Sequence, residues 1–321
     1  MQKSLAALAL AAASVIVLSG CSTTAPAQGA GSGTVQVVAS TNVYGSLAAE
    51  IGGKRVTVTS LIDSAAKDPH SYEASARDRL AVQGADLVIE NGGGYDSFME
   101  QLRDGSDAEV ITAAEFSHDY PGTTAEHDDH ADEHSEEHAD EHGHVHIEGF
   151  NEHVWFDPHT ISHVAEQITT DLTELDPAGK ADFAANAKKL IDDLDGIDTE
   201  LDALHAELEG TAVFITEPLP GLLAAAAGLD DVTPDGFASA VEEGNDVAPA
   251  TLLEALDLIE HDKVRAVLAN AQTGGSETSR VEDAATQAGI PVLTFSELLE
   301  PDQSYAEWMR AAISDLAALQ K

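Results

Sequence analysis

The longest helical pattern in the sequence, residues 177–208, lies between two series of alternating short strands and helices, and this order limits the fold more than any other feature. Asp176 and Pro177 predict its start, with the aspartate as N-cap and the proline at the first helical position. Apolar residues then recur at helical spacing as far as Leu208. About 30 residues at 1.5 Å per residue give a helix of roughly 45 Å, which is unusual in a compact domain. Two interpretations stay open, a coiled-coil arm or a rigid strut that joins two lobes.

Short β-branched runs and helical stretches alternate on both sides of this helix. The expected strands lie at residues 35–38, 56–61, 87–90, 109–112, 211–216, 264–269 and 291–295. The expected helices lie at residues 43–51, 74–83, 95–103, 219–227, 249–261, 279–288 and 303–319, and another starts near His159. Alternation at this spacing implies βαβ units and parallel sheets. We therefore predict an α/β fold with two parallel-sheet lobes joined by a single long helix.

The N-terminus predicts export and lipid attachment. Lys3 supplies a positive charge, and residues 5–18 form an apolar run that is too short for a membrane-spanning helix but suits a signal peptide. Residues 18–21, Leu-Ser-Gly-Cys, resemble the bacterial lipoprotein box, in which the cysteine is lipidated and becomes the first residue of the mature chain. Cys21 is the only cysteine, so no intrachain disulfide can form. We expect an extracytoplasmic protein that is lipid-anchored to the cell membrane.

Changes in composition along the chain predict its domain organisation. Small polar residues with Gly and Pro follow the cysteine, as in a flexible tether. The expected divisions are a signal peptide at 1–20, a tether at 21–34, an N-terminal α/β lobe at 35–175, a linking helix at 176–209 and a C-terminal α/β lobe at 210–321.

The net charge limits the classes of partner. The chain has 15 Lys and Arg against 58 Asp and Glu, a formal charge of −43. Binding to nucleic acid needs a basic surface, and so does charge-driven binding to anionic lipid. We therefore expect no nucleic-acid partner. An acidic protein does attract small cations, although most of these carboxylates are expected simply to face solvent.

A histidine-rich tract interrupts the first lobe. Residues 126–148 hold seven His and ten Asp or Glu with no Lys or Arg, so we expect an exposed loop over 119–148. Imidazole is a preferred ligand of Zn, Cu and Ni, but ordering the loop would cost ~1–2 kcal/mol per residue. Weak, fluxional metal capture is therefore expected rather than one rigid site, with a solvated tract of no function as the alternative. The capturing histidines would be His127, His130, His134, His138, His142, His144 and His146.

Two shorter motifs place single histidines where a ligand could bind. Asp68-Pro69-His70 follows the strand expected at 56–61, and parallel α/β sheets bind ligands beyond the carboxyl ends of their strands. His153 lies within residues 151–158, Asn-Glu-His-Val-Trp-Phe-Asp-Pro, beside an apolar run that must pack inward. Either histidine taken alone is more often an ordinary surface residue.

The order of these motifs resembles the family of zinc- and manganese-binding lipoproteins that serve ABC importers. The resemblance covers nearly all of residues 35–321 and implies a metal held in the cleft between two α/β lobes. By position it implies His70 and His153 as the first two ligands. Glu217 matches the third, where zinc-type members commonly have His and several manganese-type members have Glu. Glu297 lies where the fourth ligand, usually Asp, is found, so this position departs from the family pattern.

The residues themselves agree with this ligand set. Glu217 and Glu297 each follow an apolar strand, where a buried, unpaired carboxylate would be costly. Two neutral histidines and two carboxylates around a dication sum to zero net charge. A solvent-facing loop position is the alternative for each glutamate.

We therefore expect the substrate-binding lipoprotein of a metal ABC importer, a monomer that captures zinc and delivers it to the permease and its ATPase. The histidine-rich tract favours zinc, whereas Glu217 in place of His suits manganese. A manganese-specific protein of the same family, a secreted zinc hydrolase and a metal-dependent surface adhesin are the alternatives. His159 and His163 form a competing histidine pair, but they lack the His-Glu-x-x-His metalloprotease pattern. Walker A, dinucleotide-binding and nucleophile-elbow motifs are also missing, so we expect no enzyme.

Overall fold

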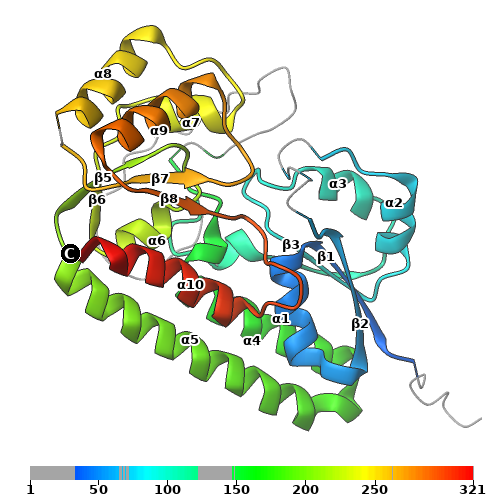
Figure 1. Cartoon of the computed structure of the whole chain (residues 1–321). Coiled ribbons are helices and arrows are strands. Elements are labelled where there is room, and N and C mark those ends of the chain that lie inside the picture. The colour runs from blue at the N-terminus through cyan, green and yellow to red at the C-terminus, as the bar shows by residue number, and fades with distance from the viewer. Residues whose placement is uncertain are drawn as a thin grey trace, which may run out of the picture. The chain divides into compact units, whose positions relative to one another are not determined.

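The computed structural model describes residues 33–64, 67, 69, 72–121, 147, 149–261 and 263–320, and within them it contains two four-stranded parallel sheets. Cys21, His70 and the seven histidines of the tract lie outside the described residues. The predicted α/β fold of two parallel-sheet lobes with a long helix is confirmed (Figure 1).

The first sheet is built from the β-branched segments that the sequence predicts as strands. Its strands are β1 (Val35–Thr41), β2 (Val56–Ile62), β3 (Leu87–Glu90) and β4 (Glu109–Thr112), and its helices are α1 (Asn42–Gly52), α2 (Ala76–Gln83) and α3 (Phe98–Arg103). The strands run parallel in the order β2-β1-β3-β4, so their carboxyl ends share one edge. The central strands β1 and β3 are almost wholly buried, as expected when helices cover both faces of a sheet.

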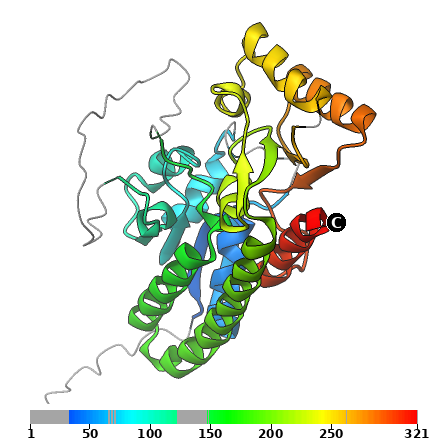
Figure 2. The same ribbon diagram turned by 90° about the vertical axis from the view of Figure 1, so that its left-hand side faces the viewer.

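Two long helices follow the first sheet and pack side by side, as Figure 2 shows. They are α4 (Pro158–Leu175) and α5 (Lys180–Leu208). The predicted break at Asp176 and Pro177 is confirmed. However, the Asp176 carboxylate accepts a hydrogen bond from the Ala178 amide and caps a 3₁₀ turn, η4 (Pro177–Gly179), so α5 begins later than predicted.

The apolar stripe of α5 decides between the two interpretations of the long helix. The buried residues of this stripe are Phe183, Ala187, Leu190, Leu194, Ile197, Leu201, Leu204 and Leu208. They face α1, α4 and the C-terminal helix α10 (Tyr305–Ala317). A coiled-coil arm would leave this stripe for another chain, so that alternative is wrong. The helix is a strut packed against the body of the protein.

The second sheet repeats the strand and helix alternation. Its strands are β5 (Thr211–Ile215), β6 (Leu229–Asp231), β7 (Val267–Asn270) and β8 (Val292–Phe295), and its helices are α6 (Gly221–Ala226), α7 (Phe237–Glu242), α8 (Pro249–Glu260) and α9 (Ser276–Ala288). The strands are parallel in the order β6-β5-β7-β8. The sequence did not predict β6, which is only three residues long and ends in two aspartates, or α7, which lies between the turn-forming residues 234–236 and Gly244.

One hydrophobic cluster extends through both sheets and the long helices. It includes Val37 from β1, Leu190 from α5, Ile215 from β5 and Ile313 from α10. Helix α10 returns from the second sheet to pack against α5 and α1 (Figure 1). The two lobes therefore share a core, and they belong to a single unit that begins at Gly33. No helix in the described part of the chain is long and apolar enough to span a membrane.

Candidate metal centre

The motif at residues 151–158 packs inward as predicted. Its apolar run forms a buried 3₁₀ turn, η3 (Val154–Phe156). The Tyr305 hydroxyl of α10 donates a hydrogen bond to the Trp155 carbonyl at 2.7 Å, and the Phe156 ring stacks on Trp308 with centroids 4.9 Å apart. Because α10 holds η3 at two points, the residue before it has little freedom to move.

That residue is His153, which is fully buried. Its Nδ1 lies 2.8 Å from Asn151 Oδ1, which also accepts the His153 backbone amide. The Asn151 amide nitrogen donates to the Pro218 carbonyl at 2.9 Å, and this bond fixes which end of the Asn151 side chain is the acceptor. Nδ1 therefore carries the ring proton and Nε2 carries the lone pair, the form in which a neutral imidazole binds a metal.

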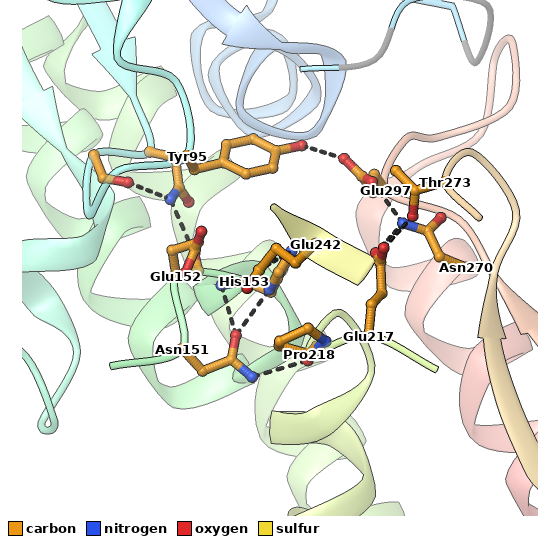
Figure 3. Close-up of polar contacts among 12 residues, drawn as sticks. Tyr95, Asn151, Glu152, His153, Glu217, Pro218, Glu242, Asn270, Thr273 and Glu297 are labelled. Atoms are coloured by element: carbon orange, nitrogen blue, oxygen red, sulfur yellow. Dashed lines mark hydrogen bonds and ion pairs between the residues drawn. The ribbon is translucent and has the colours of Figure 1, made fainter. Parts of the chain in front are cut away.

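Glu217 and Glu297 meet across three neighbouring strands. Glu217 follows β5, Asn270 ends β7 and Glu297 follows β8, and these strands are adjacent in the sheet. The Asn270 side-chain amide donates to Glu217 Oε1 and, at 2.7 Å, to Glu297 Oε1. One amide thus holds both carboxylates at the carboxyl edge of the sheet, where α/β sheets bind ligands (Figure 3).

The remaining oxygens of these carboxylates have further donors. Thr273 Oγ1 donates to Glu217 Oε2, and Tyr95 Oη donates to Glu297 Oε2 at 2.8 Å. Tyr95 follows β3 of the first sheet, so this bond joins the two halves of the chain at the site. Neutral donors of this kind orient a carboxylate without cancelling its charge.

Two glutamates that the sequence did not single out complete the cluster. Glu152 precedes His153, and Glu242 ends α7. One ligand atom from each of Glu152, His153 and Glu242 lies within 4.8 Å of the other two, a spacing that could hold a metal ion. Glu242 Oε1 lies 3.9 Å from His153 Nε2. Figure 3 shows Glu242 and His153 on one side of the cluster, with Glu217 and Glu297 on the other.

The pKa of Glu242 reflects the charges of the neighbouring glutamates. Burial above all, together with the negative charges of Glu152, Glu217, Glu243 and Glu297, raises the pKa of Glu242 to about 9. Carboxylates from the edge of the second sheet, from the loop before η3 and from the end of α7 therefore repel one another in a buried space. A divalent cation would relieve this repulsion, and carboxylate oxygens with one imidazole nitrogen are ligands that Zn and Mn accept.

Replacing Glu242 with glutamine is expected to stabilise the metal-free protein. The ordinary pKa of the glutamate is 4.5 and its folded value is about 9, so its contribution to stability is complete below pH 4.5 and is lost as pH rises toward 9. Glu242→Gln should therefore raise the melting temperature at pH 7.5, on a scale of about 2–4 °C per kcal/mol, with the gain shrinking toward pH 4.5. Thermal unfolding in a chelating buffer at both pH values measures this. The exposed Glu254→Gln on α8 is the matched control, because Glu254 is not among the charges that raise the Glu242 pKa, and equal shifts in the two variants would contradict the prediction.

The structure brings together three of the four predicted ligands, His153, Glu217 and Glu297 (Figure 3), and His70 lies outside the described residues. Sequence reasoning missed Asn270, although it ends a strand and the rule that pointed to Glu217 would also have found it. Nothing in the sequence singled out Glu242, because it ends a six-residue helix in a segment where no helix or strand was predicted.

Comparison with known proteins identifies the family. The manganese-binding lipoprotein MntA of Halalkalibacterium halodurans is 28% identical over 161 residues, which cover 50% of this chain and 46% of that protein. The zinc-binding protein AdcA of Streptococcus pyogenes serotype M3 is 23% identical over 191 residues, 55% of this chain and 35% of AdcA. The match thus spans less than half the length of these relatives. The periplasmic zinc-binding protein TroA from Treponema pallidum has the same fold, with a TM-score of 0.67 at 18% identity over 90% of this chain and 99% of TroA. The family model of the periplasmic zinc-uptake complex component A matches residues 37–319, and the chain therefore belongs to that family.

Proposed function

We propose that this protein captures a divalent cation, zinc in the first place, and delivers it to the permease and ATPase of an ABC importer. The observation that supports the proposal most directly is the cluster of His153, Glu217, Glu242 and Glu297. Its carboxylates repel one another in a buried space, and a dication would relieve that repulsion. His70 is proposed as a further ligand from the sequence alone. The family consists of metal-binding transport proteins, so the chain is not an enzyme and the hydrolase alternative is excluded.

Zinc is proposed because the family model is that of a zinc-uptake component and because the histidine-rich tract suits zinc. Manganese remains the second candidate for a specific reason. The described candidate ligands supply one imidazole and several carboxylates, and oxygen-rich shells suit manganese. Any nitrogen and oxygen site of this kind binds zinc more tightly than manganese, so affinity alone does not name the transported metal.

The test therefore combines metal content, affinity and uptake. The protein is purified without added metal and its metal content is measured, and chelator competition then gives its affinities for zinc and manganese. Cells that lack the protein are complemented with the wild type, Glu297→Gln or the exposed control Glu300→Gln, and uptake of each metal is followed. We expect restored zinc uptake with wild type and control and a loss with Glu297→Gln. If manganese uptake were restored and zinc uptake were not, manganese would be the transported metal. If the purified protein bound no metal, the proposal would be overturned.

Lipid attachment at Cys21 is part of the proposal and predicts the fate of one variant. Cys21→Ser should leave a folded protein that carries no lipid and is either shed or retained as an uncleaved precursor. Metabolic labelling with a fatty acid, followed by fractionation, measures this. Incorporation of the label into the variant would rule out lipidation at this position.

Deleting residues 126–146 should leave the tight site intact and remove only weak additional binding. The physical reason is the backbone entropy of ordering so polar a tract, ~1–2 kcal/mol per residue, which opposes a tight site within it. Calorimetric titration of the full-length and deleted proteins with zinc compares the two. If the tight phase disappeared while the weak phases stayed, the roles assigned to the tract and to the buried cluster would be reversed.

A further inference from the structure

Two exposed histidines outside the buried cluster face each other at the start of α4. His159 Nε2 lies 3.3 Å from His163 Nε2, and the ring planes are nearly perpendicular at 85°. Residues four apart lie on the same face of a helix, so the backbone holds the two imidazoles together. Two nitrogens bound to one tetrahedral zinc at 2.0–2.1 Å would be roughly 3.3–3.4 Å apart. The pair therefore already has the separation that one ion requires.

Hydrogen bonding gives His163 the protonation state that a ligand needs. His163 Nδ1 lies 3.4 Å from Glu166 Oε2, and a carboxylate accepts a hydrogen bond, so the ring proton is expected on Nδ1. Nε2 then carries the lone pair on the side that faces His159. A carboxylate that fixes the tautomer of a ligating histidine is a common feature of metal sites.

Carboxylates around the pair offset the positive end of the helix. A helix N-terminus disfavours cations. Here Asp157 is the N-cap, and its carboxylate accepts hydrogen bonds from the His159 and Thr160 amides. Asp198 of the neighbouring helix α5 lies close enough for charge interaction with both Asp157 and His159. A cation at the pair would thus have two aspartates beside it, one on each helix.

We propose that His159 and His163 form a second cation site, with water as the remaining ligands and Asp198 as a neighbouring negative charge. It would take the borderline cations that prefer imidazole, zinc above all, and not calcium or magnesium. Because both side chains are exposed, the site is expected to be weaker than the buried cluster. It shares no residue with that cluster and does not depend on the transport function.

The test uses the full-length chain with the seven histidines of the 126–148 tract replaced by alanine, so that the tract does not mask a weak site. One equivalent of zinc fills the tight site, and Ni²⁺ is then titrated by calorimetry. We expect one further equivalent, whose affinity falls at least about tenfold in His163→Ala and less in Asp198→Asn. His261→Ala is the matched control, because this exposed histidine has a carboxylate, Asp257, at 3.1 Å.

A second readout counts the coordinated rings directly. Pulsed electron paramagnetic resonance with Cu²⁺ in place of Ni²⁺ should detect two imidazoles in the parent and one in His163→Ala. Circular dichroism checks that each variant is folded, which is expected because both side chains lie on the surface. Absence of the further equivalent, or equal binding and equal ring counts in the parent and His163→Ala, would overturn the proposal and leave the contact as a hydrogen bond between two imidazoles.

Discussion

Replacing His153 with alanine is expected to lower the affinity for zinc at least tenfold, because the change removes the one imidazole of the described cluster and leaves its carboxylates in place. Partners that only orient metal ligands typically contribute about 10–100-fold in affinity, so the loss of a ligand itself should be no smaller. The other donors cannot move in to compensate, since Asn270 and Tyr95 hold Glu297 in position. Competition with a chelator of known affinity measures the effect, and His70→Ala is expected to behave in the same way.

His159→Ala is the matched control for this prediction. It removes an imidazole six positions along the chain that is exposed on α4, so the tight zinc affinity should not change. Unchanged affinity in His153→Ala would remove the basis of the proposed site. An equal loss in both variants would instead point to a general effect on α4 and the turn that precedes it.

Zinc affinity should fall by up to ~100-fold per pH unit below about pH 6.5, because two histidine ligands then take up protons. Each zinc ion released in that range should be replaced by two protons. Protonation of Glu217 and Glu297 as the pH falls further should add to this loss. Affinities measured at pH 5.5 and 7.5 test the histidines. A difference of less than about threefold would require an all-oxygen site in place of the proposed one.

The high pKa of Glu242 predicts that zinc affinity also depends on pH above 7.5. If only the four predicted ligands bound zinc, all of them would be in their binding forms above about pH 7.5, and the zinc affinity would level off there. If Glu242 also binds, its proton, held up to pH about 9, must leave when the metal enters, so affinity should rise about tenfold per unit between pH 7.5 and 9. Glu242→Gln should be flat in that interval. A flat wild-type curve would show that Glu242 stays protonated beside the metal.

The fold was largely predictable because its signals are local. Strands such as Val35–Thr41 are β-branched runs, and apolar residues recur at helical spacing along α5 from Phe183 to Leu208, which is about seven turns. The unpredicted elements carry weaker signals, because β6 is three residues long with two aspartates and α7 is flanked by turn-forming residues. Their positions depend on packing against residues distant in the sequence.

The site was predictable only where its residues follow a strand or a distinctive motif. Glu217 and Glu297 come directly after apolar strands, and His153 lies in a motif with a buried aromatic run. Asn270 also ends a strand, but its role was not predictable, because its amide bridges two carboxylates from other strands and no spacing along the chain encodes such a bridge. Glu242 reaches the cluster through the tertiary position of α7, which only the three-dimensional structure reveals.

The return of α10 to the first half of the chain has a consequence for biosynthesis. Asn42, at the start of α1, exchanges hydrogen bonds with the Leu299 backbone, and Tyr305 holds the Trp155 carbonyl. The first half therefore lacks part of its core until the last segment of the polypeptide is available. Domains with separate cores can fold one after another during synthesis, but contacts this distant in sequence must wait. The chain would thus stay incompletely folded while it emerges, which suits threading across a membrane and exposes its apolar segments to aggregation until the last helix arrives.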